Sequence, residues 1–273
     1  MASQPFRFKK FSVEQEGAAH PVGTDGVLLG AWADVEGCHS ILDIGTGTGM
    51  VALMLAQRNP TPDPSPIGRG GVERSVTSTI RNARDEASPL PMGEGSGVGL
   101  RITAVEIHPP SAALARRNFA ASPWAEQLEA IESSIQDFAQ QTEKQFDLIV
   151  SNPPFFSETT VSPDAARRLG RHTASLLPEE LLAVSKKLLT ENGRLCVILP
   201  VQEGKRLCEL AVPNGLYCTE EIEVRSRPEK PVERLLLRFE RNPYGFERKH
   251  LVVYTQGAAY SADFQRLTED FYL

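Results

Sequence analysis

Short apolar runs alternate with amphipathic helical patterns along most of the chain. The run SILDIG (40–45) precedes a helical pattern over 50–59, and RITAVEI (101–107) precedes one over 109–122. Near the C-terminus two β-like runs are separated only by a short loop, which predicts an antiparallel hairpin. Repeated βα units before such a hairpin predict an α/β fold with a doubly wound, seven-stranded, mostly parallel sheet. The predicted strands cover 40–45, 101–107, 128–133, 146–152, 194–200, 216–226 and 232–241.

A further amphipathic helix is predicted over 178–193, the segment PEELLAVSKKLLTENG. Leu181, Leu182, Leu188 and Leu189 fall on one face of this helix. Gly193 is expected to end it, because glycine commonly follows the last turn of a helix.

One segment interrupts the pattern between the first predicted helix and the second strand. Of the 41 residues from 60 to 100, 13 are proline or glycine, and neither a period of 2 nor a period of 3.6 is sustained. We expect a disordered surface insertion within a single domain that otherwise spans 1–273.

A glycine-rich turn follows the first predicted strand. Gly45, Gly47 and Gly49 stand between a strand and a helix, where the backbone can approach a ligand closely and helix N–H groups face it. An acidic residue about 20 positions further on would bind a ribose. Glu106 lies 57 residues after Gly49, and removal of the 41-residue insertion leaves 16. The spacing therefore supports both the insertion and a cofactor-binding role for Glu106.

Two ligand classes fit such a turn, a dinucleotide and S-adenosylmethionine. Dinucleotide sites use the spacing G-x-G-x-x-G to accommodate a pyrophosphate. Here Asp43 precedes the first glycine, in the sequence DIGTGTG. Its carboxylate would repel a pyrophosphate but would attract a ligand with an ammonium and a sulfonium group. The charge favours S-adenosylmethionine; an NAD-dependent oxidoreductase is the alternative from another class, and a plain α/β turn is the alternative without function.

The fourth predicted strand runs into the sequence Asn152-Pro153-Pro154-Phe155-Phe156. Prolines can end a strand, so structure alone could explain them. An amine conjugated to a purine ring, however, is a poor nucleophile until its lone pair is localised. The Asn152 side-chain oxygen and the Pro153 carbonyl could accept its two N–H bonds, while Pro154 fixes the turn and Phe155 or Phe156 stacks on the base. This pattern predicts methylation of a planar nitrogen without a strong general base.

Composition narrows the class of protein. The net charge of −6 argues against a protein that coats nucleic acid, although it allows a local basic patch. The four cysteines show no C-x-x-C pairing, so buried thiols are expected and a metal site is not. The first residues lack the apolar core of a signal peptide, and no apolar run is long enough to span a bilayer. We expect a cytoplasmic monomer without a membrane segment.

The segments LDIGTGTG, AVE and SNPPF together resemble the class I, Rossmann-like S-adenosylmethionine-dependent methyltransferases of the Asn-Pro-Pro-aromatic type. Residues 6–32 are similar to the N-terminus of bacterial tRNA adenine-N6 methyltransferases that act on valine tRNA beside the anticodon. The resemblance implies tRNA as partner, adenine 37 as target, residues 1–32 closing over the cofactor, and Thr24 and Asp25 facing its methionine end. Protein-glutamine, rRNA-guanine and DNA-adenine methyltransferases share the motif and remain alternatives, as does a catalytically inactive module that only binds RNA.

The chain departs from the methyltransferase pattern in one place. An aspartate commonly follows the third strand to hold the cofactor adenine, whereas here Ser133 or Ser134 takes that position and Asp137 comes later.

Three basic groups are candidates for tRNA contacts. Arg7, Lys9 and Lys10 interleave with Phe6, Phe8 and Phe11, which also suits a short strand with its rings inward. Residues 225–249 hold eight Lys or Arg against four Glu. The loop after the Asn-Pro-Pro turn supplies the third group, Arg167, Arg168 and Arg171, and His172 in the same loop is not required as a base.

Thr24 and Asp25 are also expected to cap the helix that follows them.

Overall fold

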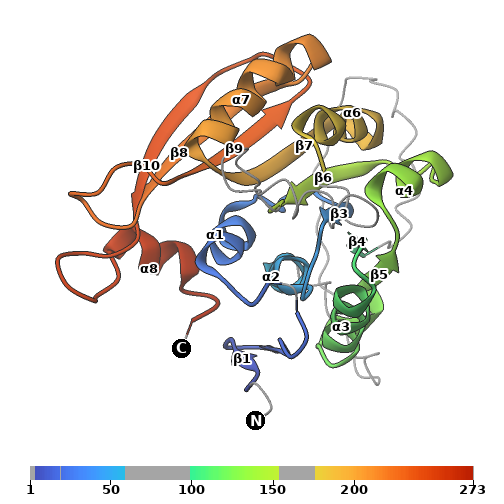
Figure 1. The fold of residues 1–273 in the computed structure, drawn as a ribbon, viewed down its shortest axis with the longest axis horizontal. Coiled ribbons are helices and arrows are strands. Elements are labelled where there is room, and N and C mark those ends of the chain that lie inside the picture. Colours follow the sequence, from blue (N-terminus) through green and yellow to red (C-terminus); the bar gives the residue numbers. More distant parts are fainter. Residues whose placement is uncertain (1–3, 19, 59–98, 154–175, 273) are drawn as a thin grey trace, which may run out of the picture.

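The computed structural model describes residues 4–18, 20–58, 99–153 and 176–272. Its main sheet has eight strands in the order β10-β8-β9-β7-β6-β3-β4-β5 (Figure 1). These are β3 (Ser40–Ile44), β4 (Arg101–Glu106), β5 (Leu128–Glu132), β6 (Phe146–Ser151), β7 (Leu189–Pro200), β8 (Tyr217–Arg225), β9 (Arg234–Glu240) and β10 (Glu247–Val252). The five strands from β5 to β7 are parallel, and β9 is antiparallel to both β7 and β8. The predicted α/β class and the C-terminal hairpin are confirmed.

Helices cover both faces of this sheet (Figure 1). One apolar core lies under α1 (Thr24–Trp32), α2 (Met50–Arg58), α3 (Pro109–Ala120) and α8 (Ala262–Thr268). The second lies under α4 (Ile135–Gln141), α6 (Pro178–Leu188) and α7 (Val201–Ala211). Short 3-10 turns at Ala125–Gln127 and Val212–Asn214 precede β5 and β8.

The sequence pattern did not indicate β10, the eighth strand of the sheet. It pairs in parallel with β8 at one edge, and four of its six residues are exposed and polar or charged. Edge strands commonly carry charged side chains that discourage pairing with other chains, so they lack the apolar run that marks an interior strand.

Gly193 does not end a helix, contrary to the prediction. Helix α6 stops at Leu188 and β7 begins at Leu189, so the chain passes straight from helix to strand. The pairing of β6 with β7 jumps from Phe146–Leu189 to Leu148–Arg194, which leaves an irregularity around the glycine. A Cβ on Gly193 would lie 2.8 Å from the Phe146 carbonyl oxygen. The lack of a side chain at Gly193 therefore allows the backbones of the two strands to approach closely. The four leucines predicted to share a face are buried.

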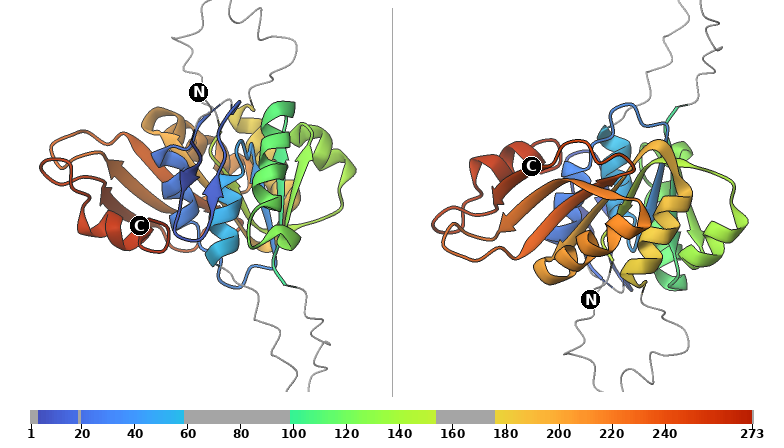
Figure 2. Two further views of the ribbon diagram at one scale, coloured as in Figure 1. Left: turned by 90° about the horizontal axis from the view of Figure 1, so that it is seen from below. Right: turned by 90° about the horizontal axis from the view of Figure 1, so that it is seen from above.

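A two-stranded hairpin, β1 (Phe6–Arg7) with β2 (Ser12–Val13), lies over the helical layer that contains α1 and α2 (Figure 2). Phe8 and Phe11 are buried and stack with centroids 4.5 Å apart. The Lys9 N–H donates to the Phe271 carbonyl oxygen at 2.9 Å, which joins the hairpin to the C-terminal tail. The inward position of the rings is confirmed for Phe8 and Phe11, although both lie between the two strands and only Phe6, which is partly buried, lies in one.

Most of the expected insertion at 60–100 lies outside the described residues. The described residues resume at Gly99, and Leu100 is buried in the core beside β4. Helix α2 ends and β4 begins at the edge of the sheet opposite the glycine turn, because Arg101 pairs with Ser40 at the start of β3.

Replacing residues 60–98 by a short Gly-Ser linker is expected to leave kcat/KM for methyl transfer within about twofold of the full chain, because loop length has a small effect on stability. Steady-state kinetics of the two proteins at equal cofactor concentration provide the check. A loss beyond about tenfold would assign the segment a role in the reaction.

Candidate active site

Three neighbouring parallel strands end at one edge of the sheet, and Asp43, Glu106 and Asn152, three of the predicted cofactor and catalytic residues, stand at or directly after those ends. Asp43 in β3 pairs with Ala104 of β4 on one side and Val150 of β6 on the other. The buried Ser151 hydroxyl donates to the Ile44 carbonyl oxygen at 3.0 Å, which fixes the end of β6 against β3. Between β3 and β6 the strand order reverses, and open α/β sheets bind ligands at such a point.

The glycine turn after β3 requires its glycines. Gly45, Gly47 and Gly49 have φ values of 72°, 57° and 82°. The N–H groups of Gly45 and Thr46 donate to the Val105 carbonyl oxygen at 2.9 and 3.3 Å, which anchors the turn on β4. A Cβ built on Gly45 or Gly47 would meet no described atom within 4 Å. The backbone of the turn is therefore approachable from the side where a ligand would bind.

Gly49 differs from the other two glycines because a helix lies against it. A Cβ there would come within 2.5 Å of Cε1 of Phe119, on α3. Gly49→Ala is expected to destabilise the fold by about 2 kcal/mol, through the strained φ and the overlap with the ring. Urea unfolding measures the loss, and adding Phe119→Leu is expected to recover part of it. Equal losses in the single and double variants would show that the ring is not the obstacle.

Asp43 is a buried carboxyl group, 2% exposed. The Thr46 hydroxyl donates to its Oδ2 at 2.6 Å. Burial raises the pKa of Asp43 to about 7; the bond from Thr46 acts against that shift, and the charge of Glu106 adds to it. A cation placed beside this group would favour the ionised carboxylate. The site therefore suits a ligand with an ammonium group.

Glu106 ends β4 with its side chain 8% exposed. Its Oε2 accepts the Gly47 N–H at 2.9 Å, and its Oε1 accepts the His108 N–H at 2.8 Å. The carboxylate thus touches the glycine turn directly; its predicted contact with a ribose stays a prediction. The next residue, Ile107, is 40% exposed and offers an apolar surface at the rim of the site. Ile107 was not among the predicted site residues, although an apolar residue directly after the acidic end of a strand could have indicated it.

Asn152 and Pro153 follow β6 directly and are both partly buried. The Asn152 Nδ2 lies 3.9 Å from the position that a Cβ on Gly26 would take, so the first turn of α1 packs beside the amide. Asn152 therefore stands at the edge of the sheet that carries Asp43 and Glu106. Pro154, Phe155, Phe156, Arg167, Arg168, Arg171 and His172 lie outside the described residues.

The expected capping role of Thr24 and Asp25 is wrong. Helix α1 begins at Thr24, its N-cap residue is Gly23, and no side chain caps it. Glycine is an acceptable N-cap, and Asp25 instead falls in the first turn, where its charge suits the helix dipole. The Asp25 carboxylate accepts the Arg234 Nε–H at 2.8 Å, which joins α1 to the start of β9.

The position after β5 is occupied by serine, as expected. Ser134 caps α4: its hydroxyl oxygen accepts the Asp137 N–H at 3.0 Å and donates to the Asp137 carboxylate at 2.7 Å. The Ser133 N–H donates to the Glu106 carbonyl oxygen at 3.0 Å. Asp137 therefore belongs to the helix cap.

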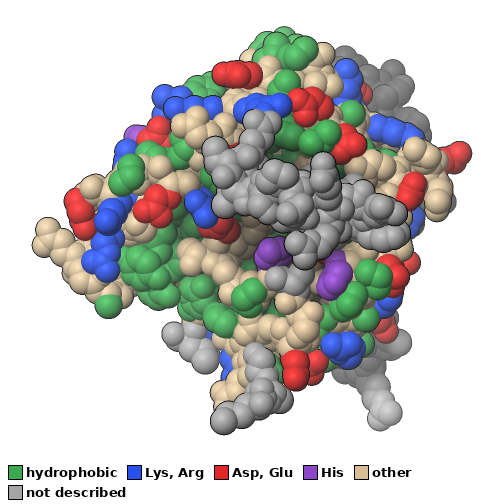
Figure 3. Space-filling model, viewed as in Figure 1, with side chains coloured by type: hydrophobic (Ala, Val, Ile, Leu, Met, Phe, Trp, Pro, Cys, Tyr) green, Lys and Arg blue, Asp and Glu red, His purple; other side chains and the backbone are tan. Residues whose placement is uncertain are grey.

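Of the described basic residues proposed for RNA contact, those in 225–249 are largely engaged within the protein, whereas most of the N-terminal ones are not. The Lys9 ammonium donates to the Glu269 carbonyl oxygen, whereas Arg7 and Lys10 are exposed. In the face shown in Figure 3, Lys and Arg side chains are interspersed with Asp and Glu. Six of the eight basic residues in 225–249 have partners: Arg225 with Glu223, Arg234 with Asp25, Arg238 and Lys249 with Glu220, Arg248 with Glu221, and Arg241 with backbone carbonyls of 186–190.

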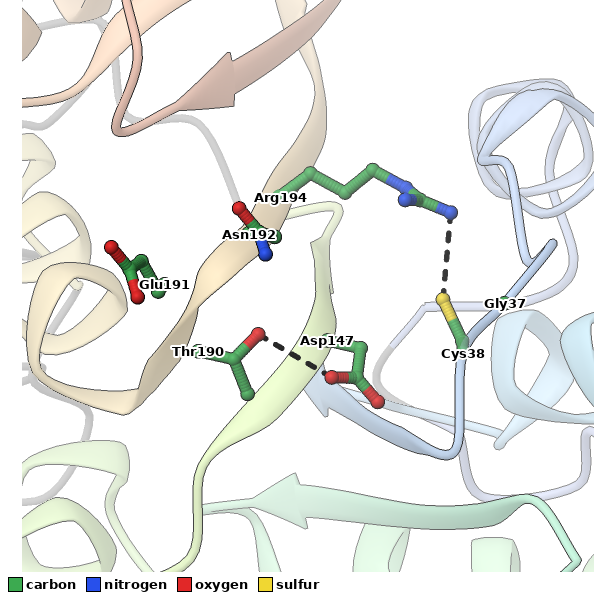
Figure 4. Close-up of a pocket in the computed structure, with 7 residues that line it drawn as sticks. All are labelled: Gly37, Cys38, Asp147, Thr190, Glu191, Asn192 and Arg194. Atoms are coloured by element: carbon green, nitrogen blue, oxygen red, sulfur yellow. Dashed lines mark hydrogen bonds between the residues drawn. The ribbon is translucent and has the colours of Figure 1, made fainter. Parts of the chain in front are cut away.

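A cavity of about 450 Å³ opens at the opposite edge of the sheet (Figure 4). Its polar groups bond to one another and to neighbouring residues of the fold. Thr190 donates to Asp147 at 3.3 Å, and Arg194 reaches the Cys38 sulfur at 3.5 Å. Asp147 also accepts the His39 and Ser40 N–H groups, so it ties the starts of β3 and β6 together. These hydrogen bonds hold strand ends together, so the polar residues of the cavity have a structural role. The cavity also lies away from Asn152.

Within 4–18, 20–58, 99–153 and 176–272 no cluster of three or more His, Cys, Asp or Glu is arranged to hold a metal ion. None of the helices in the part of the chain that the structure describes is long and apolar enough to cross a membrane.

Comparison with known proteins gives a consistent result. The methyltransferase small domain family matches residues 96–207. A tRNA1(Val) (adenine(37)-N6)-methyltransferase of Trichodesmium erythraeum is 36% identical over 273 residues, covering 100% of this chain and 99% of the relative. One of the same name from Yersinia enterocolitica is 37% identical, covering 98% of this chain and 92% of the relative.

Among solved structures, a predicted O-methyltransferase from Agrobacterium tumefaciens is similar in fold, with a TM-score of 0.56. The match covers 90% of this chain and 96% of that one at 16% identity. At that identity the likeness concerns the fold alone.

Proposed function

The chain belongs to the tRNA1(Val) (adenine(37)-N6)-methyltransferase family, and on that premise we propose that it transfers a methyl group from S-adenosylmethionine to the exocyclic N6 of an adenine in tRNA. The observation that carries the proposal is the position of Asn152, at the end of β6 and at the same sheet edge as Asp43 and Glu106. The target proposed from the family name is adenine 37 of a valine tRNA. The enzyme is proposed to act as a cytoplasmic monomer.

The residues of the glycine turn fit the cofactor. S-adenosylmethionine supplies an electrophilic methyl group on a positively charged sulfur. The Asp43 carboxylate would pair with the ammonium of the methionine part, and the open backbone at Gly45 and Gly47 allows close approach. Glu106 would accept hydrogen bonds from the ribose hydroxyls. These bonds would either replace the bond from the Gly47 N–H or form in addition to it. Ile107 would pack against the adenine, and Asp25 would remain near the methionine end.

The chemistry at the target nitrogen is assigned to Asn152 and Pro153. Their two oxygens would accept the N–H bonds of the amine and so localise the lone pair on the nitrogen. The rigid Pro-Pro turn sets these acceptors before the substrate arrives, which lowers the cost of ordering in the transition state. Because the proton leaves only after the nitrogen has become cationic, no strong general base is required. Phe155 is proposed to stack on the flipped base, with Phe156 behind it.

Substrate choice within this chemistry is a separate part of the proposal. A glutamine amide, a guanine and an adenine in DNA also present a planar nitrogen to the same acceptors. The family relationship favours tRNA over these substrates. We propose residues 1–32 as a closing segment over the cofactor and Arg7, Lys10, Arg167, Arg168 and Arg171 as phosphate contacts, with Lys9 as a weaker candidate because its ammonium already has a partner.

A competition experiment tests the substrate class. The protein is incubated with labelled S-adenosylmethionine and an equimolar mixture of unmodified valine tRNA, rRNA fragments, duplex DNA and a release-factor protein. Label is expected in the tRNA alone. Label in another component, with the tRNA unlabelled, would transfer the proposal to the corresponding alternative; the same tRNA with adenine 37 replaced by guanine is the matched control.

A further inference from the structure

One buried amide outside the predicted motifs connects the glycine turn with the N-terminal segment. Asn118, on α3, is 3% exposed. Its Nδ2 donates to the Thr48 carbonyl oxygen at 2.8 Å and to the Glu14 carbonyl oxygen at 3.1 Å. Its Oδ1 accepts the Glu14 N–H at 2.9 Å. A single side chain thus holds both backbone polar groups of one residue and the carbonyl of another.

Arg117 and Phe119, on either side of Asn118, contact the same two segments, the N-terminal segment and the glycine turn. Phe119 is the ring that excludes any side chain at Gly49. Arg117 makes an exposed ion pair with the Glu14 carboxylate at 3.6 Å. One short stretch of α3 therefore forms the seat of the glycine turn and holds the N-terminal segment beside it.

The residues after Glu14 connect it to helix α1, which packs beside Asn152, the proposed catalytic amide. The Gln15 side-chain oxygen accepts the Val22 N–H at 2.9 Å, which joins the residue after Glu14 to the residues just before α1. Helix α1 starts two residues later, and its Gly26 packs against Asn152. Hydrogen bonds and a short loop thus join the cofactor turn, through Asn118, to the helix that flanks Asn152.

We propose that Asn118 is a positioning residue that couples the glycine turn to the N-terminal segment, so that cofactor binding and the placement of α1 beside Asn152 depend on each other. The amide is suited to this role because it offers a donor to two carbonyls and an acceptor to one N–H in a dry setting. The inference rests on the proposed cofactor site at the glycine turn.

Two variants separate the bonds of Asn118. Asn118→Asp keeps an acceptor for the Glu14 N–H but turns an oxygen toward the Thr48 and Glu14 carbonyls, whereas Asn118→Ala removes all three bonds. Both are expected to raise the Kd for S-adenosylmethionine by about tenfold and to lower kcat, because a buried carbonyl loses its donor. Glu14→Ala is expected to bind the cofactor like the wild type, since only the backbone of Glu14 bonds to Asn118.

Gln57→Ala is the matched control for loss of a buried amide. Gln57 is 5% exposed, and its Nε2 donates to the Asp270 carbonyl oxygen at 2.7 Å, at the far end of α2 from the turn. Its removal should destabilise the protein without changing the cofactor Kd. Calorimetric titration with S-adenosylmethionine gives the Kd of each variant.

Hydrogen exchange provides a second test, and its first part uses the wild-type protein alone. Cofactor binding is expected to slow exchange of the Glu14 amide, and this protection should be lost in Asn118→Ala but retained in part in Asn118→Asp. Unchanged Glu14 exchange in the wild type, or wild-type cofactor Kd in both Asn118 variants, would overturn the coupling. If Glu106→Ala also binds the cofactor normally, the proposed cofactor site itself is wrong.

Discussion

Replacing Asn152 with alanine is expected to lower kcat for methyl transfer to tRNA by roughly 10²- to 10³-fold, the range found when one preorganised partner of the reacting atoms is removed. The amide follows β6 directly, and its Nδ2 lies beside Gly26 of α1 at the sheet edge that carries Asp43 and Glu106. Without it the target nitrogen loses one of the two acceptors that localise its lone pair. Single-turnover kinetics with saturating cofactor measure the chemical step.

Asn192→Ala is the control for this prediction. Asn192 lines the cavity at the opposite edge of the sheet and is expected to leave kcat unchanged (Figure 4). The Kd for S-adenosylmethionine should change far less than kcat in Asn152→Ala. Asn152 is also an expected cofactor contact, but Asp43 and Glu106 are the main ones proposed. A kcat within about threefold of the wild type would remove Asn152 from the mechanism.

Asp43→Asn is expected to weaken cofactor binding and to stabilise the ligand-free protein at the same time. Burial raises the pKa of Asp43 to about 7, above that of an aspartate in an unfolded chain. Between about pH 4 and 7 the folded state therefore holds a proton that the unfolded state has released, and the free energy of unfolding falls as the pH rises. Above about pH 7 the whole penalty of the buried charge is present, so the neutral amide should add about 1–3 kcal/mol there.

The same substitution removes the proposed partner of the cofactor ammonium, and the Kd for S-adenosylmethionine is expected to rise by about 100-fold. In the wild type, cofactor affinity should fall as the pH drops below about 7, since the ligand binds the ionised carboxylate. Calorimetric titration and urea unfolding at pH 5.5 and 8 measure both effects, with Asp137→Asn, in the α4 cap, as the control. A variant that binds normally at both pH values would contradict the assignment.

Local sequence patterns were sufficient for the central part of the site. A glycine turn between a strand and a helix, an acidic residue ending the next strand, and prolines ending a third are features of neighbouring residues, so they can be recognised without the fold. The parallel topology then places the three strand ends at one edge. For this reason the sequence predicts that Asp43, Gly47, Glu106 and Asn152 lie near one another, and the structure places them at that edge; their roles toward cofactor and substrate stay predictions.

Features that depend on contacts between distant segments could not be predicted in this way. Asn118 meets Glu14 and Thr48 only after α3 has packed on the glycine turn. The pairing of Asp25 with Arg234 joins residues 209 positions apart, and in sequence both read as candidates for other roles. Strand β10 owes its place to pairing with β8 rather than to an apolar run. Gly193 reads as a helix stop until the backbone of β6 is seen against it.

The location of the transferred methyl group tests the account most directly. Valine tRNA is incubated with the protein and labelled S-adenosylmethionine, digested to nucleosides and analysed by mass spectrometry against N6-, N1- and C2-methyladenosine standards. The account predicts label in N6-methyladenosine with the wild-type protein and its loss with Asn152→Ala. Label on another atom of the base, or equal label with the two proteins, would contradict it.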